Sequence, residues 1–344
     1  MVDYSLTLLS KKRKNQWNEL VENAPQGGFF HSYEYLQVLE KGLGLKPLHL
    51  LLSKNGGVVG GIPNFLVPQG RYNILTSLPI PPSYGGPILT KKTDQVLDLL
   101  FDGLNRILQQ EAILSHQIYL SVRSVGLANY LSRRGYVPKV WTCRFILHLD
   151  EIYRNLSRRR QRDIAWISKN IQNKEGVCTE RYKLTQENIN TFFLLYEETC
   201  KALGVSPVPL IFFRSLPTFL DEEDVALFFL STGEKIAGQL CFLDQKNKSV
   251  HPLFLGSKRS AVREFKSHIC LYDSTIRWAQ ERGFETYDFG ATSPDLLYGL
   301  YNFKREFGGI PLPDLVWVKE APSNFAPCGI FKRIYRTCSQ FFTS

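Results

Sequence analysis

One stretch near the end of this 344-residue chain constrains its fold more than any other. Residues 286–309 begin with a short strand that ends at Phe289 and Gly290, continue through a loop, and close with a helix that stops at Gly308. In the helical part, apolar side chains recur at the spacing of a single helix face; these are Leu296, Leu300, Phe303 and Phe307. The segment therefore predicts a strand, a loop and an amphipathic helix with one buried face.

A lysine on this predicted helix lies beside the apolar face. Lys304 follows Phe303, so it stands about 100° round the helix from it, and Asp288 ends the preceding strand one loop away. A cation and a carboxylate in this arrangement predict a place for a reacting group of a substrate. The alternative is structural: Gly308 ends the helix, and Lys304 is a solvated charge of the kind that a helix C-terminus favours.

The order of residues in this segment resembles a family signature. Tyr-Asp-Phe-Gly, a gap, and then Gly-Leu-Tyr-x-Phe-Lys-x-x-Phe-Gly-Gly is similar to the closing motif of FemAB-like acyltransferases. These GNAT-related proteins include the enzymes that add amino acids to peptidoglycan precursors. Less specific matches to the family extend over most of the chain, at residues 28–36, 84–87, 156–162 and 196–204.

The resemblance implies an α/β (α+β) fold of two tandem GNAT-like domains, each a mixed, mostly antiparallel sheet flanked by helices. A length of 344 residues suits two domains. The predicted elements agree with a duplication, because the order of two helices, a hairpin, a strand, a helix and a strand occurs twice. We place the boundary near Asp150, between an N-terminal domain of residues 1–150 and a C-terminal domain of residues 151–344 that carries the signature. The halves share no obvious sequence identity, so the duplication rests on element order.

Apolar periodicity and turn residues give the individual elements. Helices are predicted at residues 16–22, 31–41, 94–110, 127–133, 151–173, 187–203 and 210–219, and in a segment that ends at Arg282. Strands are predicted at residues 6–9, 48–53, 58–67, 118–122, 141–149, 225–230, 236–243, 250–255, 286–289 and 315–318. The Asn55-Gly56-Gly57 turn predicts a hairpin between two of these strands.

Charge and cysteine usage limit the partners and the compartment. The balance of 42 basic and 32 acidic residues gives a net charge of +10, which points to anionic partners such as phosphate, pyrophosphate, RNA or an acidic membrane surface. The seven cysteines are scattered without a C-x-x-C pair, and the six histidines are isolated. This pattern argues against a zinc site or a disulfide framework and favours reduced thiols in the cytoplasm.

The sequence predicts no membrane-spanning segment. No run approaches the roughly 18 apolar residues that cross a bilayer, and the N-terminus lacks the apolar core of a signal peptide. Residues 330–342 are basic and apolar. They predict either a docked C-terminal helix or a contact with the membrane surface. We therefore expect a cytoplasmic protein that can be peripheral to the inner face of the membrane.

The resemblance to GNAT enzymes implies a place for the acyl donor. In these enzymes the fourth strand splays from the fifth, and the donor pyrophosphate binds the backbone amides of the following helix. The equivalent stretch, residues 255–267, lacks the usual glycine pattern Gln/Arg-x-x-Gly-x-Gly/Ala, which disfavours ordinary acetyl-CoA binding. We predict that basic side chains contact the donor phosphates instead; these are Lys258, Arg259, Arg263 and Lys266. A solvated basic loop is the alternative.

A second basic cluster, residues 154–162, opens the helix that joins the halves. Because arginine makes bidentate contacts with phosphate, we predict that Arg158 and Arg162 bind the substrate. Tyr298 and Tyr301 of the signature helix are predicted as further substrate-binding residues. By resemblance, the phosphates belong to a nucleotide-linked or lipid-linked cell-wall precursor or to an aminoacyl-tRNA. A solvated linker helix is the alternative.

The chain contains no Gly-x-Ser-x-Gly motif and no phosphate-binding loop of the Gly-x-x-x-x-Gly-Lys-Ser/Thr type. Acyl transfer to an amine proceeds by direct attack, so the protein has to position the reactants, remove the amine proton and stabilise an oxyanion. We predict that Lys304 stabilises the oxyanion and that Asp288 positions the lysine or the amine. No metal and no tightly bound cofactor are expected.

Two function hypotheses remain at this stage. The first is an N-acyltransferase that moves an acyl or aminoacyl group from acyl-CoA or aminoacyl-tRNA to an amine acceptor, which we expect to be a cell-envelope precursor. The second is a non-catalytic protein of the same fold that binds RNA or acidic glycan. The +10 charge and the two basic clusters favour the second, and the C-terminal motif favours the first.

Overall fold

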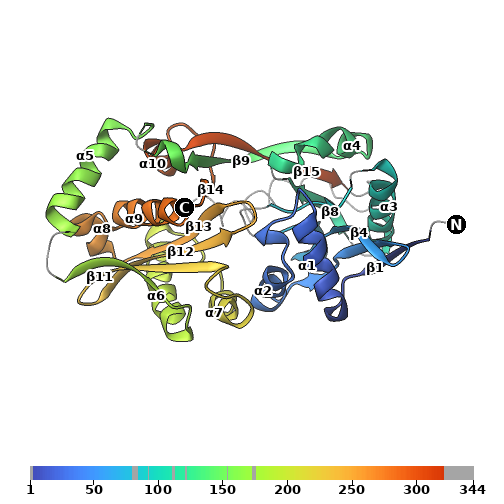
Figure 1. Ribbon diagram of the computed structural model, residues 1–344, viewed down its shortest axis with the longest axis horizontal. Helices are drawn as coiled ribbons and strands as arrows, with labels where there is room; N and C mark the ends of the chain where they lie inside the picture. The colour runs from blue at the N-terminus through green and yellow to red at the C-terminus, as the bar shows by residue number, and fades with distance from the viewer. Residues whose placement is uncertain are drawn as a thin grey trace. The chain divides into compact units, whose positions relative to one another are not determined.

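The computed structural model describes residues 3–79, 84–91, 93–110, 113–120, 122–152, 154–172 and 176–320 (Figure 1). The basic and apolar segment 330–342, for which we predicted a docked helix or a membrane contact, lies outside these residues. Within the described ranges, no helix combines the length and the hydrophobicity needed to cross a membrane.

The chain divides into two compact units. Of the described residues, 3–141 and 314–320 form the first unit, and 142–313 form the second. Two long strands, β9 (Val137–His148) and β15 (Ile310–Glu320), each have residues in both units. The assignment of residues 1–150 and 151–344 to two GNAT-like domains stays a prediction.

Strands of the second unit lie side by side in one sheet, which starts with the strand at Val177. Its order is β10 (Val177–Tyr182), β11 (Val225–Thr232), β12 (Lys235–Asp244), β13 (Ser249–Ser257) and β14 (Thr286–Thr292), with the second part of β9 beside β14. All neighbours are antiparallel except β13 and β14, which are parallel. These two strands pair only at Ser249 and Val250 against Thr286 and Tyr287. Their pairing then ends, as expected for the splayed strands of a GNAT sheet.

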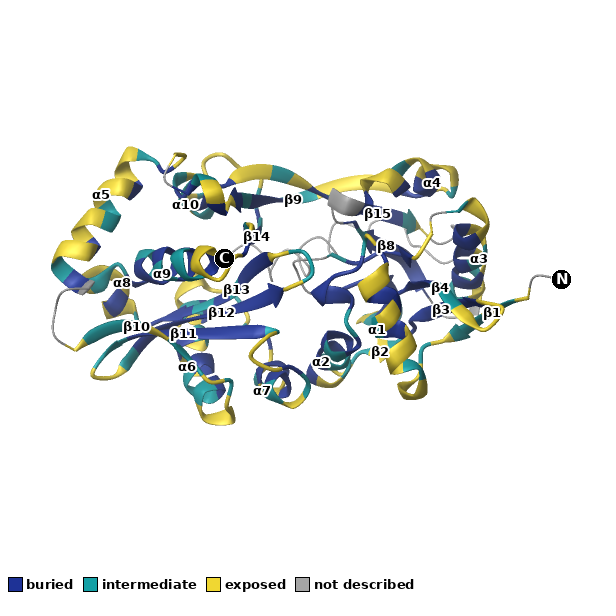
Figure 2. Ribbon diagram, viewed as in Figure 1, coloured by how far each residue is buried: buried dark blue, intermediate teal, exposed yellow. Residues whose placement is uncertain are grey.

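Helices cover both faces of this sheet (Figure 1). Helices α6 (Gln186–Leu203) and α7 (Leu210–Phe219) lie on one face, where Phe213 of α7 contacts Phe254 of β13 at 4.9 Å between ring centroids. Helix α9 (Ser267–Glu281) lies on the other face, and its Trp278 ring packs on Phe228 at 5.2 Å. Figure 2 shows the strands between them as largely buried, whereas α5 (Arg158–Ile167) is largely exposed.

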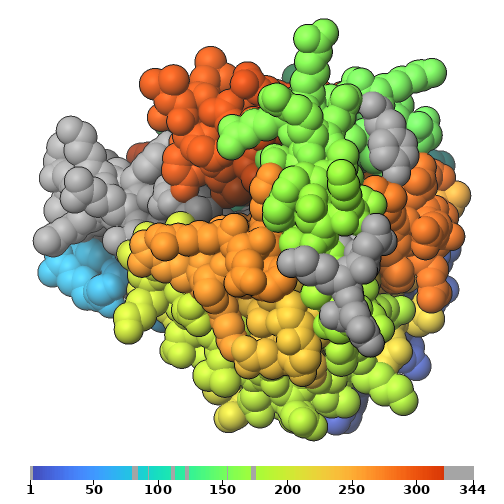
Figure 3. All heavy atoms as spheres, turned by 90° about the vertical axis from the view of Figure 1, so that its left-hand side faces the viewer, coloured from blue at the N-terminus to red at the C-terminus, as the bar shows by residue number. Residues whose placement is uncertain are grey.

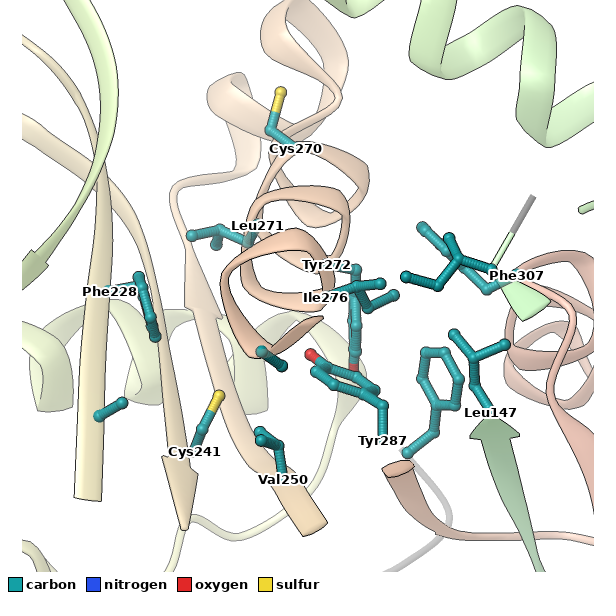
Figure 4. Packing of buried hydrophobic residues seen from close by; sticks show 14 of the residues in the cluster. Leu147, Phe228, Cys241, Val250, Cys270, Leu271, Tyr272, Ile276, Tyr287 and Phe307 are labelled. Carbon is teal, nitrogen blue, oxygen red and sulfur yellow. The ribbon is translucent and has the colours of Figure 1, made fainter. Parts of the chain in front are cut away.

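The core beneath α9 fixes the two elements that carry the signature residues. Figure 4 shows Tyr272 and Ile276 of α9 next to Tyr287 of β14, with Leu147 and Phe307 close by. The hydroxyls of Thr275 and Tyr287 lie 2.7 Å apart in a hydrogen bond. The rings of Tyr272 and Phe307 lie 5.7 Å apart. Strand β14 and the end of α10 (Gly299–Glu306) are therefore held against the same helix.

The first unit contains two groups of strands. One is a four-stranded sheet in the order β1 (Tyr4–Leu8), β3 (Leu50–Lys54), β4 (Gly57–Ile62) and β7 (Ile88–Leu89). The other has β8 (Ile113–Tyr119) between β15 and β6 (Tyr72–Thr76), followed by β5 (Phe65–Gln69) and β2 (Lys46–Pro47). Its helices are α1 (Lys14–Asn23), α2 (Tyr33–Leu43), α3 (Asp94–Gln110) and α4 (Ala128–Arg133). The apolar face of α3 packs in the core of this unit, where Leu97, Leu100 and Leu104 are buried and Ile107 and Leu108 are partly buried.

Several predicted elements differ from those observed. The predicted strand 58–67 is two strands, β4 and β5, because Pro63 between them has no amide hydrogen for a sheet. The predicted helix 151–173 begins only at Arg158, where the Ser157 hydroxyl caps it by accepting from the Arg160 amide, and it widens to a π-helix over Ser168–Gln172. The strand predicted at 118–122 lies at Ile113–Tyr119, and β6, β10 and the short helix α8 (Arg259–Phe265) were not predicted.

The signature helix is shorter than the apolar pattern suggested. It begins at Gly299, so Leu296 lies in the preceding loop with 63% of its surface exposed, and the prediction that Leu296 belongs to the buried stripe is wrong. Phe307 is buried at the other end of the helix. In the loop before the helix, the Leu297 amide donates to the Asp295 side chain and the Asn302 side chain donates to the Leu296 carbonyl.

Candidate functional site

Lys304 is buried, although it is a charged residue near the end of a short helix. Only 3% of its surface is exposed. Its ammonium donates hydrogen bonds to the carbonyl oxygens of Gly290, at 3.0 Å, and Ala291, at 2.8 Å. The alternative that Lys304 is a solvated helix-end charge is therefore wrong. The side chain instead links α10 to the end of β14 and holds a positive charge inside the second unit.

Asp288 lies two residues before the first of these carbonyls and is fully buried. Its carboxylate accepts hydrogen bonds from the Gly290 amide at 2.8 Å and from the Arg144 guanidinium at 3.2 Å. The His251 Nδ1 atom lies 3.6 Å from the same carboxylate. Asp288 thus fixes the turn that follows it, and Gly290 is held at its amide by Asp288 and at its carbonyl by Lys304.

The backbone of Gly290 explains this local arrangement. Its φ of +72° lies in the left-handed region, which glycine adopts without strain. The residue also lies in the irregularity between Asp288 and Ala291, where the pairing of β14 with β9 shifts register. Because of this bulge, the carbonyls of Gly290 and Ala291 can both face the Lys304 ammonium. Contrary to the prediction, Asp288 lies within β14 and not at its end, and glycine two positions after it suits the conformation of the lysine site.

Two residues of this cluster were not predicted from the sequence. Arg144 comes from β9 and His251 from β13, and both are buried beside Asp288. In the sequence His251 is isolated, since no neighbouring residue suggests a partner. The pairing of Arg144 with Asp288 spans 144 positions, so local patterns carry no signal for it.

The four predicted donor-phosphate ligands do not form one cluster of unpaired cations. Lys258 forms an ion pair with Glu234 at 2.7 Å, and Lys266 forms one with Asp163 at 2.6 Å. Arg259 and Arg263 are exposed on α8, and no ion pair of their side chains is seen among the described residues. The Arg259 amide donates to the Glu198 carboxylate at 3.0 Å. A carboxylate of the protein therefore already bonds the first turn of α8.

The predicted substrate-binding residues occupy two kinds of position. Arg158 and Arg162 are exposed on α5, the green helix that Figure 3 shows on the surface of the second unit. Tyr298 is half-buried just before α10, and burial raises the pKa of its hydroxyl. Tyr301 is buried with its ring against Phe145, at 4.8 Å between centroids. The structure thus places Tyr301 in the core beside Lys304 and leaves the two arginines accessible.

The described residues contain no group of three or more histidine, cysteine or acidic side chains with the spacing of a metal site. The expectation that the protein uses no metal stays a prediction.

The fold is similar to that of several solved proteins. The solved structure of FemX superposes with a TM-score of 0.69 at 15% identity, over 97% of this chain and 99% of that one. The structure of L-PGS from Bacillus licheniformis gives a TM-score of 0.56 at 12% identity, over 81% and 85% of the two chains. A tandem GNAT protein from the clavulanic acid biosynthesis pathway gives 0.56 at 11% identity, over 94% and 100%.

At these identities the structural similarity shows the fold alone, and it confirms the predicted tandem GNAT-like architecture. No curated protein matches the sequence. Residues 70–295, well over half of the chain, match the FemAB-like family, which is described as peptidoglycan biosynthesis/recognition. The match ends before α10, so it does not test the role of Lys304. The chain belongs to the FemAB-like family, the acyltransferase family that its C-terminal motif predicted.

Proposed function

We propose that this protein transfers an aminoacyl or acyl group from an activated donor to an amine of a cell-envelope precursor. The observation that supports the proposal most directly is the Lys304 ammonium, which is buried and fixed by the carbonyls of Gly290 and Ala291. A fixed positive charge in a site shielded from water is the feature that stabilises a developing oxyanion.

The proposed reaction needs no nucleophilic side chain. The acceptor amine attacks the carbonyl carbon of the donor and forms the new C–N bond, and the carbonyl oxygen takes up negative charge. We assign Lys304 to stabilise this charge and Asp288 to position Lys304 through Gly290. Collapse of the intermediate breaks the bond to the leaving group, which is the CoA sulfur or the ribose oxygen of tRNA, and the leaving group takes up the proton that the amine loses.

The proposed donor is an aminoacyl-tRNA, with acyl-CoA as the second candidate. The Glu198 carboxylate bonds the Arg259 amide at the start of α8, where a GNAT enzyme would bind the donor pyrophosphate. The Glu198 carboxylate at this position disfavours the binding of a second anion, such as the CoA pyrophosphate. The exposed arginines Arg158, Arg162 and Arg263 instead offer accessible positive charge for a polyanion.

The proposed acceptor follows from the family, since its description names peptidoglycan. We take the acceptor to be a nucleotide-linked or lipid-linked precursor with a free amine. We also propose that the protein acts in the cytoplasm, where the free thiols of its five described cysteines remain reduced, and that it reaches lipid-linked precursors at the inner face of the membrane.

The deciding experiment is a transfer assay with the purified full-length chain. Radiolabelled aminoacyl-tRNAs and, separately, labelled acyl-CoAs are incubated with a nucleotide-linked peptidoglycan precursor that carries a free side-chain amine. We expect label to move to the precursor from the aminoacyl-tRNA mixture. Consumption of acyl-CoA alone would reverse the choice of donor.

If no label moves but the protein binds many unrelated polyanions with steep salt dependence, the non-catalytic alternative is correct.

A further inference from the structure

Helix α10, which carries Lys304, cannot hold its own conformation. It has eight residues, and isolated helices shorter than about 12–15 residues are marginal in water. It begins with Gly299, a poor helix former, and the residue before it, Tyr298, supplies no capping hydrogen bond from its side chain. The position of Lys304 therefore depends on the contacts that α10 makes with the rest of the second unit.

Besides the hydrogen bonds of Lys304, α10 has a polar contact with Arg160 of α5. The Arg160 Nη2 atom donates to Glu306 Oε2 at 2.8 Å. The same guanidinium lies over the rings of Phe303, at 4.7 Å, and Phe307, at 4.5 Å. Arg160 thus contacts three residues of one helix end through an ion pair and two cation–π contacts.

Arg160 differs from the other arginines of its cluster because it is buried. Only 3% of its side chain is exposed, against 74% for Arg159, which reaches the same Glu306 at 3.5 Å. Asp163, 3.5 Å away, is its second acidic partner and also binds Lys266. Arg160 Nε has no hydrogen-bond partner among the residues that the structure describes.

A buried guanidinium with an unbonded N–H group is an unfavourable way to stabilise a fold, because an apolar side chain of similar volume would serve at least as well. A buried cation whose side chain contacts three residues at the end of one short helix suggests a role in positioning that helix. The contacts fix its rotation, since Glu306, Phe303 and Phe307 lie on one side, and Lys304 follows about 100° round from Phe303.

We propose that Arg160 is a positioning residue, which sets the rotation of α10 through Glu306, Phe303 and Phe307 and so places the Lys304 ammonium against β14. The inference rests on the proposed function for its catalytic consequence. Its geometric part, that Arg160 keeps Lys304 in place, stands on the contacts alone and can be tested without a substrate.

The geometric test measures the accessibility of Lys304. Reductive methylation of the folded protein with formaldehyde and a borane, followed by peptide mass spectrometry, gives the labelling rate of each lysine. In Arg160→Met we expect Lys304 to be labelled about tenfold faster than in the wild type, because local opening of α10 becomes easier. Arg159→Met is the matched control, since it removes an exposed guanidinium from the same Glu306. In this variant the labelling rate of Lys304 should stay within about twofold of the wild-type rate.

Two further variants keep the test decisive. Glu306→Gln removes the ion pair from the side of α10 and replaces Arg160→Met in the test if that variant does not fold. Arg160→Lys keeps the charge but loses the planar contact with the rings, so we expect it, too, to raise the labelling rate of Lys304. The exposed Lys248 provides an internal standard for the labelling reaction. Equal labelling rates of Lys304 in the wild type and in every folded variant of Arg160 and Glu306 would overturn the inference.

The catalytic consequence is tested with the labelled aminoacyl-tRNA and acyl-CoA mixtures. Arg160→Met should lower kcat by about ten- to a hundredfold with little change in KM, because it acts on the transition state through Lys304. In a Lys304→Met background the same change should have no further effect, whereas a general structural role would slow both backgrounds equally. If labelling rises but Lys304→Met turns over normally, the positioning inference holds and the proposed role of Lys304 fails.

Discussion

At the scale of single residues, the second unit buries the basic side chains of Lys304 and Arg144, and Arg144 forms an ion pair with the buried Asp288. We expect Lys304→Met to fold normally and to turn over at least about a hundredfold more slowly than the wild type, the typical loss when one donor to an oxyanion is removed. Steady-state kinetics with the donor found in the transfer assay give the rate. Near-normal kcat in a folded Lys304→Met protein would leave the lysine a structural role only.

The buried ion pair makes a prediction about stability. In Asp288→Asn, the buried Arg144 loses its ion pair with this carboxylate, and breaking a buried pair destabilises by about 3–5 kcal/mol. Urea unfolding of the two proteins measures the difference. Glu285→Gln is the control, because its pair with Lys248 is solvent-exposed and should change stability by less than about 1 kcal/mol. Equal effects of the two substitutions would contradict the importance of the buried pair.

At the scale of elements, α8 is the part of the splayed-strand region that presents cations to solvent. Arg259 and Arg263 are exposed there, whereas Lys258 and Lys266 already have acidic partners. If the arginines contact phosphate, Arg259→Ala and Arg263→Ala should each weaken donor binding by about 1–3 kcal/mol without loss of folding. Isothermal titration with the donor at low and moderate salt tests this, because an exposed contact weakens with ionic strength.

Lys258→Ala provides the comparison on the same element, and a smaller loss is expected because Glu234 already binds that ammonium. Unchanged affinity in both arginine variants would assign α8 to the solvated surface.

At the scale of the whole molecule, buried histidines make stability depend on pH. His116 of the first unit is fully buried between Tyr136 and Asn64, at 2.6 and 2.9 Å. Burial lowers the pKa of His116 and of His49 to about 3, from 6.5. Between about pH 3 and pH 6.5 these histidines bind protons in the unfolded chain but not in the folded chain. Their contribution to the free energy of unfolding is therefore fully present above about pH 6.5 and is lost as the pH falls.

Burial also lowers the pKa of His268, to about 4. We therefore expect the free energy of unfolding to drop by about 2 kcal/mol for each of the three histidines between pH 7 and pH 5. Urea unfolding at both pH values, followed by circular dichroism, measures the sum. His116→Gln should reduce the pH-dependent part by about a third, since one of the three groups no longer titrates. A stability that is independent of pH over this range would show that the histidines are accessible to protons in the folded state.

Part of the fold could be read from local patterns. The helices at Asp94–Gln110 and Leu210–Phe219 were predicted with their observed ends, and strands β11 and β12 were predicted because they are apolar runs on either side of Gly233. Strands β6 and β10 were missed, because their short mixed sequences acquire a strand conformation only through their neighbours.

The sequence by itself predicted the family, through the motif around Lys304, and the match over residues 70–295 confirmed it. The sequence also predicted the approximate course of most elements, because periodicity and turn residues act over a few positions. Only the tertiary structure decided which charges are buried and which are paired. The Arg144–Asp288 and Arg160–Glu306 pairs join residues that are 144 and 146 positions apart. Five arginines in one basic run look alike in the sequence, yet Arg160 alone among them is buried, because packing against α10 removes it from water.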